Sequence, residues 1–261
     1  MAGTTSVRTE SDAAVYRPRP RPRADRVLVC LSYCGGGTVP FRPWADTVPE
    51  DTELALICYP GREARFGTPF ARDWTVLRDD VVRAVRSLGD RPYIVFGHSM
   101  GSWLAFETVA RLEHLGVTPP EALVVSGGEA PPKCHLVPDY VPRSHDSDDT
   151  IVRWMRTYGQ ISAAIAQEPD LVRIAVDLFR ADLKVSESYR YVEGTRVSVP
   201  LRVLYGADDD EPFAEVERGW RAMTTGAYEA VELPGGHYYT PEVWSQLARR
   251  CTFPSLASLV A

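Results

Sequence analysis

The residue of this chain best suited to chemistry is a serine in the pentapeptide GHSMG, residues 97–101. This G-x-S-x-G pattern directly follows the apolar, strand-like residues 93–96, and a helical pattern begins at Ser102. A serine on a tight turn between a strand and a helix presents its hydroxyl outward, and the flanking glycines let other backbone pack around the strained turn. We therefore predict that Ser99 is a nucleophile for acyl transfer.

A serine nucleophile needs a base, and His237 is the best-placed candidate. It follows two glycines just beyond an apparent strand at residues 228–233, so that a loop can carry the imidazole back toward the serine. The other histidines lie within the GHSMG turn, near a helix end or in a helical insertion, and they are His98, His114, His135 and His145.

The acid that orients this imidazole should follow the preceding strand, which we expect at residues 201–205. The loop there offers four consecutive carboxylates, residues 208–211. A G-x-x-D turn counted from Gly206 selects Asp209 as the acid, and Asp208 stays open as the alternative.

Backbone amides would stabilise the oxyanion that forms during acyl transfer. We expect one amide from Met100, which follows the nucleophile, and one from Cys34 in the segment SYCGGG, residues 32–37. A catalytic thiol at Cys34 is not favoured, because no histidine neighbours it in the motif. A phosphate-binding loop is not favoured either, because the glycines are not followed by Lys-Ser or Lys-Thr.

The segments that must position these residues alternate between short apolar runs and longer amphipathic stretches such as residues 75–88 and 102–115. This alternation predicts an α/β fold with a mostly parallel central sheet and helices on both faces. The expected strands are residues 27–31, 54–59, 93–96, 122–126, 201–205 and 228–233.

Two segments depart from this alternation. Residues 138–192 repeat apolar residues at helical spacing, which predicts a helical lid inserted in a core made of residues 26–137 and 193–261. Residues 1–25, which contain the run RPRPRPR, predict an extended arm on the surface. The lid residues expected to line a cavity over the serine are Trp154, Met155, Tyr158, Ile161, Ile165, Leu178 and Phe179.

The composition excludes several other classes of protein. The chain has 261 residues, of which 44% are apolar and 25% charged, and no apolar run reaches the roughly 18 residues of a membrane span. A net charge of −6 argues against nucleic acid as the main partner. The five cysteines lack zinc-type spacing and the N-terminus lacks a secretion signal, so we expect no metal and a cytoplasmic location. We also expect a monomer.

Taken together, these residues resemble the stand-alone type II thioesterases that accompany polyketide synthases and non-ribosomal peptide synthetases. The resemblance implies an α/β-hydrolase fold and hydrolysis of acyl or aminoacyl thioesters from the phosphopantetheine arm of an acyl or peptidyl carrier protein, without a cofactor. It also supports Asp209 over Asp208 as the acid. The matching motifs are CGG at 34–36, FRPW at 41–44, YPGRE at 59–63, RF at 65–66, GHSMG at 97–101, FE at 106–107, LFRAD at 178–182, YRY at 189–191, Trp220 and GGH at 235–237.

Some residues depart from the family and some readings stay open. The family often has proline, an aromatic residue or histidine, and alanine where this chain has SYC at 32–34, and it has other small residues at Gly37 and Ser102. We therefore expect a slightly altered oxyanion loop and substrate fit. A broad-specificity serine carboxylesterase and a non-catalytic subunit that binds carrier proteins remain alternatives. Editing of misloaded carriers and programmed release of one intermediate are not separated.

Overall fold

The sheet at the centre of this protein is mostly parallel, as predicted. The computed structural model describes residues 13–134 and 140–251, and within these residues seven strands pair in the order β1-β3-β2-β4-β5-β6-β7. All neighbours are parallel except β1, which lies antiparallel to β3 at one edge. The strands are β1 Val15–Tyr16, β2 Arg26–Leu31, β3 Thr52–Ile57, β4 Tyr93–His98, β5 Ala122–Ser126, β6 Leu201–Gly206 and β7 Tyr228–Leu233.

The central strands are apolar throughout because both faces of the sheet are covered. In β2, Val27, Val29 and Leu31 pack into one hydrophobic cluster, and Leu28 and Cys30 pack into the cluster on the other face. Continuous apolar runs are typical of parallel strands covered on both sides. The predicted strands at 122–126 and 228–233 have the observed bounds, and the other four differ from them by up to two residues at an end.

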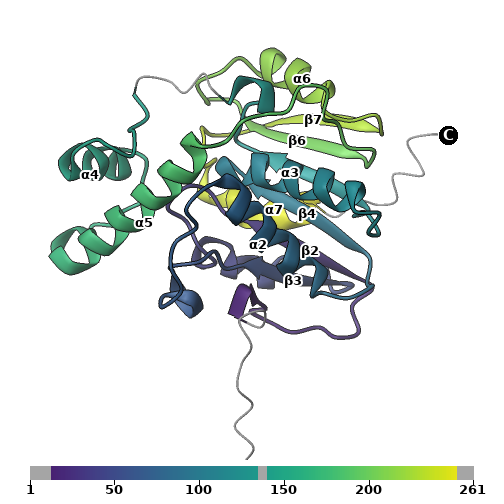
Figure 1. Cartoon of the computed structure of the whole chain (residues 1–261), viewed down its shortest axis with the longest axis horizontal. Coiled ribbons are helices and arrows are strands. Elements are labelled where there is room, and N and C mark those ends of the chain that lie inside the picture. The colour runs from purple at the N-terminus through teal and green to yellow at the C-terminus, as the bar shows by residue number, and fades with distance from the viewer. Residues whose placement is uncertain (1–12, 135–139, 252–261) are drawn as a thin grey trace, which may run out of the picture.

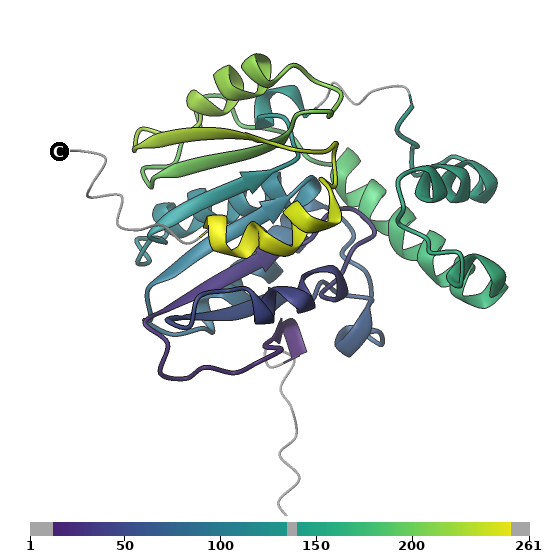
Figure 2. The ribbon, with the colours of Figure 1, turned by 180° about the vertical axis from the view of Figure 1, so that it is seen from behind.

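Helices cover both faces of this sheet (Figures 1 and 2). The buried residues of α2, α3 and α6 join one cluster, and those of α7 and the 3-10 helix η1, Val39–Asp46, join the other. Within the described residues, no helix is both long and apolar enough to cross a membrane. The helices are α2 Trp74–Arg86, α3 Met100–His114, α4 Asp148–Thr157, α5 Pro169–Glu187, α6 Phe213–Arg221 and α7 Pro241–Cys251.

The predicted helical insertion contains α4, the short 3-10 helix η4 at Ile165–Gln167, and α5, and it projects from the sheet in Figure 1. Ser147 caps α4 by accepting from Thr150 N–H, and Pro169 occupies the first turn of α5, where a missing N–H costs nothing. The two helices share a small apolar cluster of their own. Its buried members are Ile151, Met155, Ile161, Val176, Phe179 and Leu183.

Within the described part of the predicted N-terminal arm, residues 13–25, Val15–Tyr16 pair with the sheet as β1, residues 13 and 14 are helical, and residues 22 and 23 form a turn. The Arg21 guanidinium donates to the backbone carbonyls of Pro49, in the loop before β3, and of Thr52, the first residue of β3, and the Arg21 backbone N–H donates to Glu53 Oε1 at 2.8 Å. Glu53 is 2% exposed and also pairs with Arg17 and Arg91. Neither the edge strand nor this buried carboxylate was predicted, because their partners are distant in sequence.

This arrangement predicts that Glu53→Gln destabilises the fold. Its arginine partners would lose a charged acceptor, which should lower the free energy of unfolding by about 1–3 kcal/mol. Urea denaturation measures this change. The exposed Glu50 in the preceding loop provides the control, and Glu50→Gln should change stability by less than about 0.5 kcal/mol. Equal effects of the two variants would show that the buried carboxylate does not hold the arm.

Candidate active site

Ser99 lies on a strained turn between β4 and α3, with φ 55° and ψ −122°. The turn needs its two glycines because other backbone passes close to both. A Cβ on Gly97 would lie 1.9 Å from the Gly101 carbonyl oxygen, and a Cβ on Gly101 would lie 2.5 Å from the Leu31 carbonyl oxygen. A positive φ at a residue other than glycine costs on the order of 1–3 kcal/mol, which the surrounding packing must offset.

Ser102 holds this turn from below. The Ser102 Oγ lies 3.0 Å from the Gly97 carbonyl and 2.8 Å from the Ser126 carbonyl, and either carbonyl can accept its proton. The same Oγ accepts from Ser126 N–H at 3.1 Å. The Ser126 carbonyl also accepts from Ser99 N–H at 2.8 Å. Ser102 is fully buried and is absent from the wall of the cavity over Ser99, so it supports the turn rather than contacting that space.

The structure brings Ser99, His237 and Asp209 into one hydrogen-bonded chain. The distance from His237 Nε2 to Ser99 Oγ is 3.0 Å, and the distance from His237 Nδ1 to Asp209 Oδ2 is 3.3 Å. Because a carboxylate only accepts, it holds the proton on Nδ1 and leaves the Nε2 lone pair facing the serine hydroxyl. All three residues follow the carboxyl ends of parallel strands, β4, β6 and β7, which meet at one edge of the sheet.

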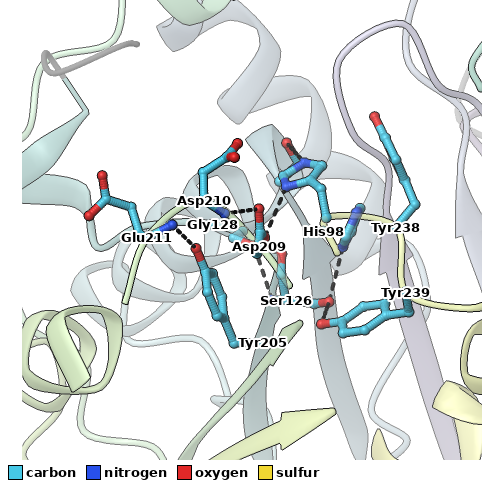
Figure 3. Close-up of polar contacts among 12 residues, drawn as sticks. His98, Ser126, Gly128, Tyr205, Asp209, Asp210, Glu211, Tyr238 and Tyr239 are labelled. Atoms are coloured by element: carbon cyan, nitrogen blue, oxygen red, sulfur yellow. Dashed lines mark hydrogen bonds and ion pairs between the residues drawn. The ribbon is translucent and has the colours of Figure 1, made fainter. Parts of the chain in front are cut away.

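The loop after β6 places Asp209 and its neighbour Asp208 in different environments. The Asp209 backbone N–H closes a turn onto the Gly206 carbonyl at 3.1 Å, which directs the side chain inward, where it is 6% exposed. Its second oxygen, Oδ1, accepts from Asp210 N–H at 3.0 Å (Figure 3). Asp208 is exposed and its backbone N–H bonds to the Gly235 carbonyl. Of the two candidates, the geometry favours Asp209 as the partner of the imidazole.

Met100 and Cys34 lie beside Ser99 on the same cavity. Met100 is the first residue of α3, a helix that has no side-chain cap, so its N–H lies at the positive end of the helix dipole. In residues 13–134 and 140–251, neither the Met100 nor the Cys34 N–H has a hydrogen-bond acceptor. Burial raises the pKa of the Cys34 thiol well above its usual value, which keeps it protonated and unsuited to nucleophilic attack.

The cavity over Ser99 has a volume of about 490 Å³ and is walled by both the core and the insertion. Of the seven insertion residues expected on this wall, Trp154, Tyr158 and Phe179 line it. Met155 and Ile161 instead pack inside the insertion's own cluster. The remaining two, Ile165 and Leu178, are absent from the wall of this cavity.

The core side of the cavity has an aromatic wall that sequence reasoning did not assign. Trp103 and Tyr189 both line it, and the Tyr189 ring stacks between Trp103 and Trp74 at centroid distances of 5.7 and 4.3 Å. The Tyr189 hydroxyl donates to Glu107 Oε1 at 3.0 Å, and burial raises the pKa of that carboxyl. The YRY and FE motifs contain Tyr189 and Glu107 and could have indicated this wall, but only the fold shows that the two motifs are in contact.

Comparison with known proteins assigns the family. A family model described as "Thioesterase domain" matches residues 26–252. The chain belongs to the thioesterase domain family. Among solved structures, the type II thioesterase BorB from the borrelidin biosynthetic cluster is 30% identical, with a TM-score of 0.76, over 94% of this chain and 100% of that one. The predicted α/β-hydrolase fold and the resemblance to type II thioesterases are both confirmed.

Two curated relatives of this chain are considerably longer than the chain itself. The probable cadicidin biosynthesis thioesterase of Streptomyces griseus is 33% identical over 88% of this chain, and the match spans 63% of that protein. The AMB antimetabolite synthetase AmbE of Pseudomonas aeruginosa is 32% identical over 88% of this chain, and the match spans 11% of that protein. The chain thus spans less than two thirds of either relative.

A second histidine, His98, lies beside His237. The ring centroids of His98 and His237 are 5.2 Å apart. His98 Nδ1 lies 3.0 Å from Ser126 Oγ, which lies 2.7 Å from the Tyr239 hydroxyl, and Figure 3 shows this chain of contacts. Within the described residues, His98 Nε2 is buried and has no hydrogen-bond partner. Burial, and secondly His237, lowers the pKa of His98 well below its usual value of 6.5.

The low pKa of His98 predicts acid sensitivity of the fold. Below pH 6.5 the unfolded chain protonates this histidine and the native protein does not, so the free energy of unfolding falls as the pH falls, by up to about 1.4 kcal/mol per pH unit. His98→Gln should make this slope shallower between pH 6.5 and 5 by about 1 kcal/mol per pH unit, measured by urea denaturation. His145→Gln, at a side chain that is 81% exposed, should leave the slope unchanged. Identical slopes for both variants would contradict this role for burial.

Proposed function

We propose that this thioesterase hydrolyses acyl or aminoacyl thioesters from the phosphopantetheine arm of a carrier protein in polyketide or non-ribosomal peptide biosynthesis. One observation carries the proposal: the hydrogen-bonded chain of Ser99, His237 and Asp209 opens onto a largely apolar cavity. These three residues provide the reacting groups, and the cavity provides space for the acyl group. Membership of the thioesterase family supports a thioester as the bond that is cleaved.

In the first half of the proposed reaction, Ser99 Oγ attacks the thioester carbonyl carbon and His237 Nε2 takes the serine proton. Asp209 holds the imidazole and stabilises the imidazolium that forms. The negative charge on the carbonyl oxygen develops beside the N–H groups of Met100 and Cys34. When the tetrahedral intermediate collapses, the C–S bond breaks and the pantetheine thiolate leaves, taking the proton from His237.

In the second half, water attacks the acyl-Ser99 ester while His237 again takes a proton. A second tetrahedral intermediate forms at the same two amides, and its collapse releases the carboxylic acid and returns the proton to Ser99 Oγ. The proposed reaction requires no cofactor, because every group that moves a proton or stabilises charge belongs to this chain. Phosphopantetheine belongs to the substrate.

The insertion supports a substrate delivered by a flexible arm. Trp154, Tyr158 and Phe179 place apolar surface opposite Ser99, which suits an acyl chain. We propose that residues 138–192 act as a lid that admits the arm and then limits water near the acyl-enzyme. The five free cysteines support a cytoplasmic location, since they fit a reducing compartment. Because a single polypeptide supplies Ser99, His237 and Asp209, we propose that the protein acts as a monomer.

A comparison of substrates tests the proposed function. One set of acyl groups, including an aminoacyl group, is loaded on a carrier protein and also presented as simple oxygen esters. We expect kcat/KM to be higher for the carrier thioesters. A strong preference for the oxygen esters would instead indicate a carboxylesterase. A flat preference across acyl groups would indicate editing, and one sharply preferred group would indicate programmed release.

Replacing the nucleophile should separate catalysis from binding. Ser99→Ala removes the attacking oxygen but little volume, so hydrolysis should fall by about 10⁶-fold while acyl-carrier affinity is kept. Hydrolysis is followed by release of the acid, and affinity by calorimetry with the loaded carrier. A variant that still performs the pathway role in cells would favour a carrier-binding subunit over an enzyme.

The two neighbouring aspartates provide a matched pair of variants. Asp209→Asn should lower kcat by about 10⁴-fold, because an amide does not hold the imidazole in the required tautomer. Asp208→Asn changes an exposed side chain on the same loop and should leave kcat within about twofold. Steady-state kinetics on one carrier thioester measures both. A larger loss for the Asp208 variant would reassign the acid.

A further inference from the structure

The loop that carries Cys34 is held by a buried ion pair from two distant segments. Asp182 on α5 accepts from Gly35 N–H at 2.8 Å through Oδ2. Arg62, which follows β3, donates from Nη1 to the Gly36 carbonyl. The two side chains bind each other through two contacts of 2.9 and 2.6 Å, and they are only 4% and 3% exposed.

The direction of the Cys34 N–H depends on the backbone turn to which it belongs. The Tyr33 carbonyl and the Cys34 N–H belong to one planar trans peptide, so fixing the direction of one fixes the other. Gly36 N–H donates to the Tyr33 carbonyl at 2.9 Å, which closes a turn over residues 33–36. Asp182 and Arg62 bind two further polar groups of this turn, Gly35 N–H and the Gly36 carbonyl, from outside the loop.

The close approach of α5 to the loop depends on glycine. Gly35 has φ +78°, and a Cβ there would lie 2.5 Å from the Phe179 ring, one turn before Asp182. Arg62 in turn lies over the Tyr59 ring at 5.1 Å, and the Tyr59 hydroxyl donates to the Ser32 carbonyl at 3.0 Å. The YPGRE, LFRAD and CGG motifs therefore meet at one place, the backbone of the oxyanion loop.

We propose that Arg62 and Asp182 are positioning residues that aim the Cys34 N–H at the oxyanion. This inference rests on the proposed function, which places the oxyanion between Cys34 and Met100. It makes the C-terminal half of α5 a part of the catalytic support as well as a wall of the cavity. Loosening the pair turns the amide away from the developing charge, which weakens transition-state stabilisation more than substrate binding.

A second buried ion pair in the same region serves as the matched control. Arg65 and Asp80 are 7% and 8% exposed, and Arg65 donates to the Cys58 carbonyl. Asp80 belongs to α2, and the hydrogen bonds and ion pairs of Arg65 and Asp80 do not reach residues 32–37 of the oxyanion loop. Breaking this pair leaves a buried arginine without its carboxylate, as breaking the first pair does, but leaves the turn at residues 33–36 untouched.

The test compares Asp182→Asn with Asp80→Asn. We expect both to lower the melting temperature. At a temperature well below both transitions, Asp182→Asn should lower kcat by about 10- to 100-fold with KM within about twofold, because removal of a whole oxyanion donor costs about 10²–10³. Asp80→Asn should keep kcat within about threefold. Arg62→Lys, which keeps the charge but loses the two-pronged contact, should give an intermediate loss and decides the question if Asp182→Asn does not fold.

A second readout keeps this inference separate from the proposed function. The rate of Ser99 phosphonylation by an alkyl fluorophosphonate depends on the nucleophile and the oxyanion amides but not on a carrier protein. The phosphonylation rate should be about tenfold or more lower in Asp182→Asn than in the wild type. In Asp80→Asn the rate should equal that of the wild type. Equal losses in the two aspartate variants, or a wild-type rate in Asp182→Asn or Arg62→Lys, would overturn the positioning role. A wild type that labels normally but ignores carrier thioesters would refute the function alone.

Discussion

The hydrogen bond between His237 Nε2 and Ser99 Oγ is the contact on which the site depends. It joins residues 138 positions apart, and either side chain alone is an ordinary polar group. A contact of this kind contributes only about 1 kcal/mol to stability, so it cannot position its own partners. The sheet does so, because β4 and β7 are parallel and their carboxyl ends lie at one edge. The turn at Ser99 and the loop at His237 then bring the two side chains together.

The strain at this edge is offset by buried polar contacts beneath it. Ser102 and Ser126 satisfy the backbone groups around the Ser99 turn, and the Ser126 hydroxyl lies between His98 and Tyr239. Every one of these side chains is buried. Buried polar groups rigidify a structure when they are satisfied, as the Ser102 and Ser126 hydroxyls are here. The turn is therefore supported from the core, and its exposed side stays available for substrate.

The insertion and the core are less separate than the order of elements suggests. Asp182, on the insertion helix α5, forms a buried ion pair with Arg62 of the core and binds the loop of Cys34. Phe179 on the same helix both lines the cavity and packs in the insertion's own cluster. Part of α5 is thus anchored to the sheet, while Leu171 and Ile174 near its other end are exposed.

The sequence by itself determined the local features of this protein. Apolar runs bounded by turn residues predicted the parallel strands, and G-x-S-x-G between a strand and a helix predicted the turn at Ser99, because these signals lie within a few residues of each other. The choice of Asp209 over Asp208 also came from a local turn. Family motifs suggested the proposed substrate class, which the reacting groups alone do not specify.

Only the tertiary structure decided the features that depend on distant partners. The pairing of β1 with β3, the burial of Glu53, and the meeting of Arg62 with Asp182 each join segments whose separation in sequence carries no local signal. The same holds for the insertion, where helical spacing gives Met155 and Trp154 similar apolar positions. Packing alone buries Met155 inside the cluster and leaves Trp154 partly buried at the edge of that cluster, where it lines the cavity.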